Sequence, residues 1–308
     1  DRSSRILTSS SDSLITKSAI RGSTGYSVSI VKSTGIILDS NVIFLSYKHQ
    51  VRFDGASSYI TYTNNLNIFN KDRGIKADAG DNAVDLTAMV YADKALTNSQ
   101  ASGNIFAGCE QNCLIVKGGA CASQASGPYT FFNNVAHSGE TGLLADAPDA
   151  SCNGITHFTA YKLEIGVVTF FKSKEVKASN LIIADTAIGV TLNTGAVTED
   201  VSISLKDSHI IGTALTADAY WNKTECNGLV GNYISVSTVG AKSIPPTSSQ
   251  LPWYRVKSDH IFKATYTVTG VTFENFDDTL VSGCAANRAI TTNPHASDSS
   301  ASTMLSNI

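Results

Sequence analysis

The chain has 308 residues, of which 42% are hydrophobic and 16% charged, with a net charge of −3 and a pI near 6.1. Its apolar content excludes a disordered chain, and scattered Lys and Arg residues exclude a nucleic-acid-binding protein. No apolar run reaches the roughly 18 residues that cross a membrane, so we expect no membrane insertion. Because the chain starts without Met or a signal peptide, we interpret residues 1–308 as one domain of a larger extracellular protein.

Short strands are predicted along residues 11–70, where β-branched residues dominate and apolar and polar residues alternate. Asn41, Asn65, Asn134 and Asn180 fall near expected turns. Asn tolerates left-handed backbone geometry there, and in stacked coils such side chains also form hydrogen-bonded ladders. These positions therefore indicate turns that repeat along the chain.

Two stretches interrupt this pattern, at residues 71–108 and 215–260. The first opens with a charged loop and continues into residues 85–94, which fit either one or two helical turns or a strand. The second contains two prolines in a row and a Pro-Trp pair. No change in composition follows either stretch, so both are predicted to be loop insertions on a single domain.

Six cysteines divide into a group of four and a distant pair, and their spacing does not suit a zinc site. Ser and Thr are abundant and Asn222 begins a glycosylation sequon, which together favour disulfides in the secretory pathway over buried thiols. Six cysteines allow 15 connectivities. We expect the last two to pair with each other and the first four to pair among themselves: Cys109, Cys113, Cys121, Cys152, Cys226 and Cys284.

A phrase of apolar run, polar break and Gly recurs with a nearly constant period. Its glycines, Gly142, Gly166, Gly189 and, more loosely, Gly212, are 24, 23 and 23 residues apart. A period in the twenties with two or three short strands per unit is typical of a solenoid. The sequence therefore predicts an all-β chain folded as a right-handed parallel β-helix.

No strong catalytic motif occurs in the sequence. The best candidate for chemistry is Asp54, which follows a predicted strand with His49 and Arg52 close by, although a structural turn at this position is the favoured interpretation. Other acidic pairs are interpreted as solvated turn residues: Asp146 with Asp149, Glu199 with Asp200, and Asp277 with Asp278.

Two histidines, His137 and His157, lie 20 residues apart, which is nearly one coil. No third ligand is evident, so we expect stacked structural histidines and predict no metal and no cofactor. The aromatic residues of this region are expected to form core stacks rather than a sugar-binding platform: Phe131, Phe132, Phe158, Tyr161, Phe170 and Phe171.

Several phrases resemble the parallel β-helix region of fibrocystin and fibrocystin-like proteins, which is shared with cell-surface hyaluronidases related to the cell migration-inducing protein. They include the stretches 131–143 and 158–162, Val271–Phe276, and the Thr-Asn-Pro phrase that ends at Pro294. The early coil 41–55 is also similar, but the family's Glu-Asp-Gly phrase is reduced here to Asp54-Gly55.

This resemblance implies a non-catalytic structural or adhesive β-helix at a cell surface or in an extracellular filament. Loss of half the acidic pair weakens the alternative of a depolymerase that cuts hyaluronan-like polysaccharides with His49, Arg52 and Asp54. A glycan-binding module without turnover is a third possibility. Expected partners are further copies of the chain, other surface glycoproteins or glycans, and the two insertions are the expected contact surfaces.

Overall fold

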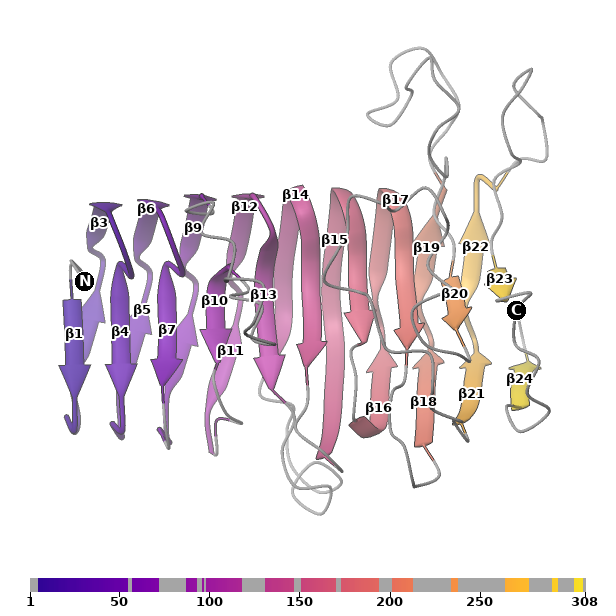
Figure 1. Ribbon diagram of the computed structural model, residues 1–308, viewed down its shortest axis with the longest axis horizontal. Helices are drawn as coiled ribbons and strands as arrows, with labels where there is room; N and C mark the ends of the chain where they lie inside the picture. Colours follow the sequence, from indigo (N-terminus) through magenta and orange to yellow (C-terminus); the bar gives the residue numbers. More distant parts are fainter. Residues whose placement is uncertain are drawn as a thin grey trace, which may run out of the picture.

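The computed structural model describes residues 5–54, 57–71, 87–92, 96, 98–117, 131–146, 151–169, 173–193, 201–212, 234–237, 264–276, 290–292 and 302–306. Every strand pairing in these residues is parallel, and each strand between the terminal coils pairs with the strand one coil before it and one coil after it. The chain therefore winds as a parallel β-helix, and its coils lie side by side from β1 to β24 (Figure 1). This confirms the predicted fold class. The described part contains no helix that is long and apolar enough to span a membrane.

Each regular coil contributes one strand to each of three parallel sheets. The first sheet contains β1 (Arg5–Thr8), β4 (Val28–Val31), β7 (Val51–Asp54), β10 (Ala88–Ala92), β13 (Asn112–Lys117), the ends of β14 (Phe131–Asp146), β15 (Ser151–Thr169) and β17 (Ile182–Asn193), then β20 (Ile234–Ser237) and β23 (Ile290–Thr292).

The second sheet contains β2 (Leu14–Thr16), β5 (Ile37–Asp39), β8 (Thr61–Thr63), β11 (Gln100–Ser102), the beginnings of β14 and β15, β16 (Ser173–Ser179), β18 (Val201–Lys206), β21 (Ala264–Thr269) and β24 (Ser302–Ser306). The third contains β3 (Ala19–Ser23), β6 (Val42–Ser46), β9 (Leu66–Asn70), β12 (Ile105–Cys109), the middles of β14 and β15, the beginning of β17, β19 (His209–Ile211) and β22 (Thr272–Glu274).

Apolar side chains from all three sheets fill the interior. One column of the first sheet contains only aliphatic residues at its described inward positions, among them Val28, Val51, Val90 and Leu114, each at most 1% exposed. Neighbouring strands of a sheet lie about 4.8 Å apart, so the ten rungs of this sheet give a rod roughly 43 Å long. The rod thus grows by adding coils while its core keeps the same width.

The corner between the second and third sheets has the same backbone conformation in nine successive coils. In each coil one residue takes a positive φ, between 48° and 68°, and turns the chain toward the next sheet. Asn, Gly and a few polar residues occupy this corner because they tolerate left-handed geometry. The nine residues are Lys17, Ser40, Asn64, Gly103, Asn133, His157, Asn180, Asp207 and Gly270.

A ladder of buried Asn side chains follows this corner. The Oδ1 atom of Asn65 accepts hydrogen bonds from the backbone N and the Nδ2 of Asn41, both at 3.0 Å. Asn104 accepts the same two bonds from Asn65, and Asn134 accepts them from Asn104. The predicted Asn ladder is thereby confirmed, with Asn104 as an additional member. Asn180 lies at the left-handed corner instead.

The repeating glycines stack where one coil approaches the next. Gly142, Gly166 and Gly189 occupy the same position in three consecutive coils. A Cβ atom on Gly142 would lie 2.6 Å from the carbonyl oxygen of Gly166, and one on Gly166 would lie 2.5 Å from that of Gly189. Gly212 does not continue this column, because β19 pairs in a register that places it beside Asp185. Gly212 therefore lies at a different corner of the coil, although it follows Gly189 at the same spacing of 23 residues.

Parts of the two predicted insertions belong to the regular coil. Within 71–108, β10 and β11 and most of β12 pair with strands on both sides, so residues 85–94 contain a strand rather than a helical turn. Within 215–260, β20 pairs with β17 and β23. Residues 72–86, 213–233 and 238–263 lie outside the described part.

Candidate functional site

One of the three residues predicted for chemistry, His49, lies in a stack of aromatic rings. Tyr26 precedes β4, His49 precedes β7, and Tyr91 lies in β10. The His49 ring lies 5.6 Å from the ring of Tyr26 and 4.5 Å from that of Tyr91, with interplanar angles of 4° and 11°. The pairing of β4 with β7 places His49 level with Tyr26, whereas the pairing of β7 with β10 places Tyr91 level with Arg52. His49 is only 5% exposed, so the stack closes over its ring.

The backbone of the following coil fixes the imidazole of His49. The N–H of Ala88 donates to Nδ1 of His49 at 3.0 Å, and the carbonyl of Ala88 lies 3.2 Å from the same atom. The shorter contact fits a neutral ring with its proton on Nε2. A buried ring whose Nδ1 already accepts a backbone hydrogen bond resembles a structural histidine more than a general base.

Positive charges surround the same rings. Arg52 donates from Nη1 to the hydroxyl of Tyr26 at 2.8 Å, and its guanidinium carbon lies 5.1 Å from the centre of that ring. The Nζ of Lys48 lies 5.5 Å from the Tyr26 ring, and that of Lys117 lies 5.8 Å from the Tyr91 ring. A cation within about 6 Å of an aromatic face is attracted to its quadrupole. We refer to Tyr26, His49, Tyr91, Lys48, Arg52 and Lys117 as the cation–aromatic ladder.

The third candidate, Asp54, ends β7 and pairs with Val31 in the preceding coil. Its side chain lies outside the described part, as do the side chain of Asp146 and all of Asp149, Glu199, Asp200, Asp277 and Asp278. The described side chains contain no group of three His, Cys, Asp or Glu residues that could hold a metal ion.

One of the expected disulfides joins Cys109 at the end of β12 to Cys113 in β13, with Cα atoms 5.1 Å apart. Cys152 is also disulfide-bonded, and every described cysteine is engaged in this way. The remaining cysteines, Cys121, Cys226 and Cys284, and the sequon residue Asn222 lie outside the described part.

The two histidines expected to stack on each other do not. His157 lies at a left-handed corner, and the ring of His137 stacks on Tyr161, with centroids 4.8 Å apart and planes at 8°. The 20 residues between the histidines fall short of the 24 that separate His137 from its true partner. Burial and the positive charge of Lys162 lower the pKa of His137 below its usual value of 6.5.

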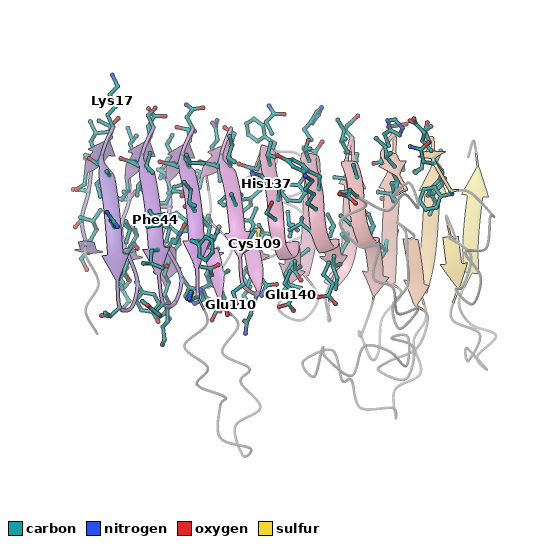
Figure 2. All side chains as sticks on the ribbon, turned by 90° about the horizontal axis from the view of Figure 1, so that it is seen from above. Lys17, Phe44, Cys109, Glu110, His137 and Glu140 are labelled. Atoms are coloured by element: carbon teal, nitrogen blue, oxygen red, sulfur yellow. A yellow bond between two sulfur atoms is a disulfide. The ribbon has the colours of Figure 1, made fainter. Side chains whose placement is uncertain are left out.

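Sequence reasoning missed a second surface, the outward side of the third sheet. Two columns of outward side chains run along it, and from β6 through β17 neither contains Lys, Arg, Asp or Glu. Phe44 and His137, both labelled in Figure 2, belong to one column. The aromatic prediction is thus right for Phe131 and Phe158, which are 7% and 2% exposed, and wrong for Phe132 and Tyr161, which are half-buried, Tyr161 on this surface. Phe170 and Phe171 lie outside the described part. We call this surface the apolar face, with these members: Val42, Phe44, Leu66, Ile68, Ile105, Ala107, Val135, His137, Thr159, Tyr161, Ile182, Ala184 and Ile211.

Two known proteins resemble this chain along most of its length. Mouse fibrocystin is 26% identical over 307 residues, which cover 90% of the chain and 7% of fibrocystin. Dog fibrocystin is 26% identical over 292 residues, which cover 87% of the chain and again 7% of the relative. No family model and no solved structure matches the chain. The chain therefore folds as a parallel β-helix and is similar in sequence to a short segment of fibrocystin.

Proposed function

We propose that this chain is a non-catalytic, rod-shaped segment of an extracellular or cell-surface glycoprotein, with a structural or adhesive role. The observation that carries the proposal is the way in which the side chains of His49 and Arg52 are packed. Both side chains pack within the cation–aromatic ladder, where the His49 ring is stacked on both sides and Arg52 donates to Tyr26. Such contacts join coils to one another and stabilise the rod.

The cell-surface location is supported by two features. The Cys109–Cys113 disulfide suits an oxidising compartment, and the relatives are fibrocystins, of which this chain spans 7%. A solenoid suits a spacer because each coil packs only on its neighbours and length is gained without a larger core. In this proposal Asn222 carries an N-glycan, and the activity of the whole protein resides beyond this rod.

A glycan-processing or glycan-binding function is the second candidate, and the cation–aromatic ladder favours it. Lys48, Arg52 and Lys117 gather around two tyrosine rings, and carboxylated sugars are recognised by such combinations of positive charge and stacking surface. In the catalytic version Asp54 would act on the substrate. In the binding version the rings and cations would suffice.

One assay separates these functions. The purified chain is incubated with hyaluronan and with other uronic-acid polymers, and their chain length is followed by gel filtration. We expect no shortening by the wild type or by Asp54→Ala. Depolymerisation by the wild type that disappears in Asp54→Ala would overturn the structural proposal. Retention on a hyaluronan column without cleavage, weakened in Lys117→Ala, would replace it with the binding module.

The secretory location has its own test. The chain is expressed behind a signal peptide in mammalian cells, together with Asn222→Gln. We expect secretion of both proteins, and a mobility shift after glycosidase treatment only in the one that keeps Asn222. Efficient folding with all cysteines reduced would contradict the secretory location. Absence of a mobility shift in the wild type would contradict glycosylation of Asn222.

A further inference from the structure

The apolar face presents an unusual surface for a rod that meets only water. Ile105 and Ile182 on it are 41% and 48% exposed, and Val42 is 40% exposed. Contiguous apolar patches larger than a few hundred Å² generally mark interaction surfaces. At its edge, Leu45 and Phe69 hold φ values of 57° and 58°, which are uncommon for large apolar residues and carry a conformational cost.

Within the two columns of the apolar face, charges appear only at the ends, whereas Lys162 and Asp185 lie at its edge, in the same column as Leu45 and Phe69. Along one column the register runs from Arg21 in β3, through Phe44 to Ile211, and ends at Glu274 in β22. Arg21 lies over the Phe44 ring at 5.5 Å, and Glu274 pairs with His209 at 2.9 Å. The column therefore carries a positive charge at its first rung and a negative charge at its last.

We propose that the apolar face binds the same face of a second copy of this chain, with the two rods antiparallel. A two-fold axis along the strand direction, passing through the rung of Val135 and His137, reverses the order of the rungs. Arg21 of each copy then faces Glu274 of the other. The two ends of the face supply two equivalent charge pairs, whereas a parallel pairing leaves both pairs unmade.

Side-chain size supports the same pairing. Counting rungs from the axis, the small Ala107 faces Tyr161 of the other copy, and Ile68 faces Ala184. In the neighbouring column, Leu66 faces Ile182. In the column of His137, large residues therefore meet small ones on both sides of the axis, and in the neighbouring column two aliphatic residues meet, which lets two flat sheets pack together.

The expected affinity is modest. Nine rungs about 4.8 Å apart and a strand width of about 10 Å give a footprint of roughly 400 Å² per copy. A total near 800 Å² belongs to weak, transient interfaces, with a dissociation constant on the order of 10–100 μM. Such contacts become effective between copies held at high local concentration on one surface. The inference stands whether or not the rod also acts on glycans.

Sedimentation equilibrium of the full chain between about 1 and 200 μM tests the proposal. We expect a monomer–dimer equilibrium that Ile182→Glu abolishes, because its carboxylate would face Leu66 of the other copy. Leu14→Glu is the matched control, since Leu14 is an exposed aliphatic residue, at 61%, on the second sheet. Circular dichroism establishes that each variant remains folded. Monomer throughout, or equal effects of both substitutions, would overturn the proposal.

Charge reversal tests the antiparallel arrangement. Arg21→Glu and Glu274→Arg should each weaken dimerisation by about 5- to 10-fold, because each variant opposes like charges at both ends of the interface. The double variant should recover the affinity of the wild type. Failure of the double variant to recover would refute the antiparallel pairing. Binding to a different protein with no self-association would likewise overturn the second copy as the occupant.

Discussion

Truncation of one rung of the Asn ladder should destabilise the rod far more than its size suggests. Asn65 is 1% exposed, and its amide makes four hydrogen bonds. Asn65→Ala leaves the backbone N–H of Asn41 buried without its acceptor, which costs about 1–3 kcal/mol. The carbonyl of Leu38 and the Oδ1 of Asn104 each lose a donor, at about 1 kcal/mol apiece. We therefore expect a loss of about 3–5 kcal/mol.

The neighbouring Asn64 provides the control. It is exposed, takes a φ of 56°, and its side chain donates one surface hydrogen bond, to Asp39 at 3.0 Å. Asn64→Gly keeps the backbone conformation and should cost less than about 1 kcal/mol. Urea unfolding of both variants, followed by circular dichroism, compares them directly. Equal destabilisation of the two would refute the reasoning, since the ladder would then contribute no more than a surface contact.

Three further changes test other parts of the rod. Gly166→Ala should lower stability by about 2–3 kcal/mol in thermal unfolding, because its Cβ would lie 2.5 Å from the carbonyl oxygen of Gly189. Replacing both Cys109 and Cys113 by Ser should cost about 2 kcal/mol, the closure entropy of so short a loop, and the difference should vanish when both proteins are compared in reductant. The lowered pKa of His137 makes the fold favour the neutral ring, so its contribution is full above pH 6.5 and declines as pH falls below it.

Each of these has a result that would contradict it. A Gly166→Ala protein as stable as the wild type would mean that adjacent coils separate easily. A double Ser variant that is less stable than the reduced wild type would place the effect in packing rather than in the crosslink. For His137, the urea midpoint is compared at pH 7.5 and 5.0 in the wild type and His137→Gln. An identical pH dependence in both would assign it to another group.

The sequence predicted the fold because coil contacts restrict residue type at regular positions. The stacked positions of Gly142 and Gly166 admit no Cβ, and the corner position favours Asn, so both repeat visibly in the sequence. Asn104 was missed for a physical reason. It lies 39 residues after Asn65, whereas Asn41 lies 24 residues before it, so no constant period reaches Asn104.

The site was harder to predict because strand alternation shows which side chains share one side of a sheet. It does not show whether that side is buried or exposed. Val42, Ile43 and Phe44 are all apolar, yet only Ile43 points inward, where it is fully buried. A strand with two apolar sides resembles one buried on both faces. The partner of His137 escaped prediction in a similar way, because strand register decides between Tyr161 and His157.

The Asn ladder also makes the stacking of the coils independent of the number of residues in each coil. Consecutive ladder residues are separated by 24, 39 and 30 residues, and yet each makes the same pair of bonds to the next. Register is thus set locally at the corner and not by counting along the chain. Segments between strands can lengthen, shorten or be exchanged without disturbing the coils beside them. The rod can accordingly serve as a scaffold for grafting, because segments between strands can vary in sequence while the Asn ladder stays constant.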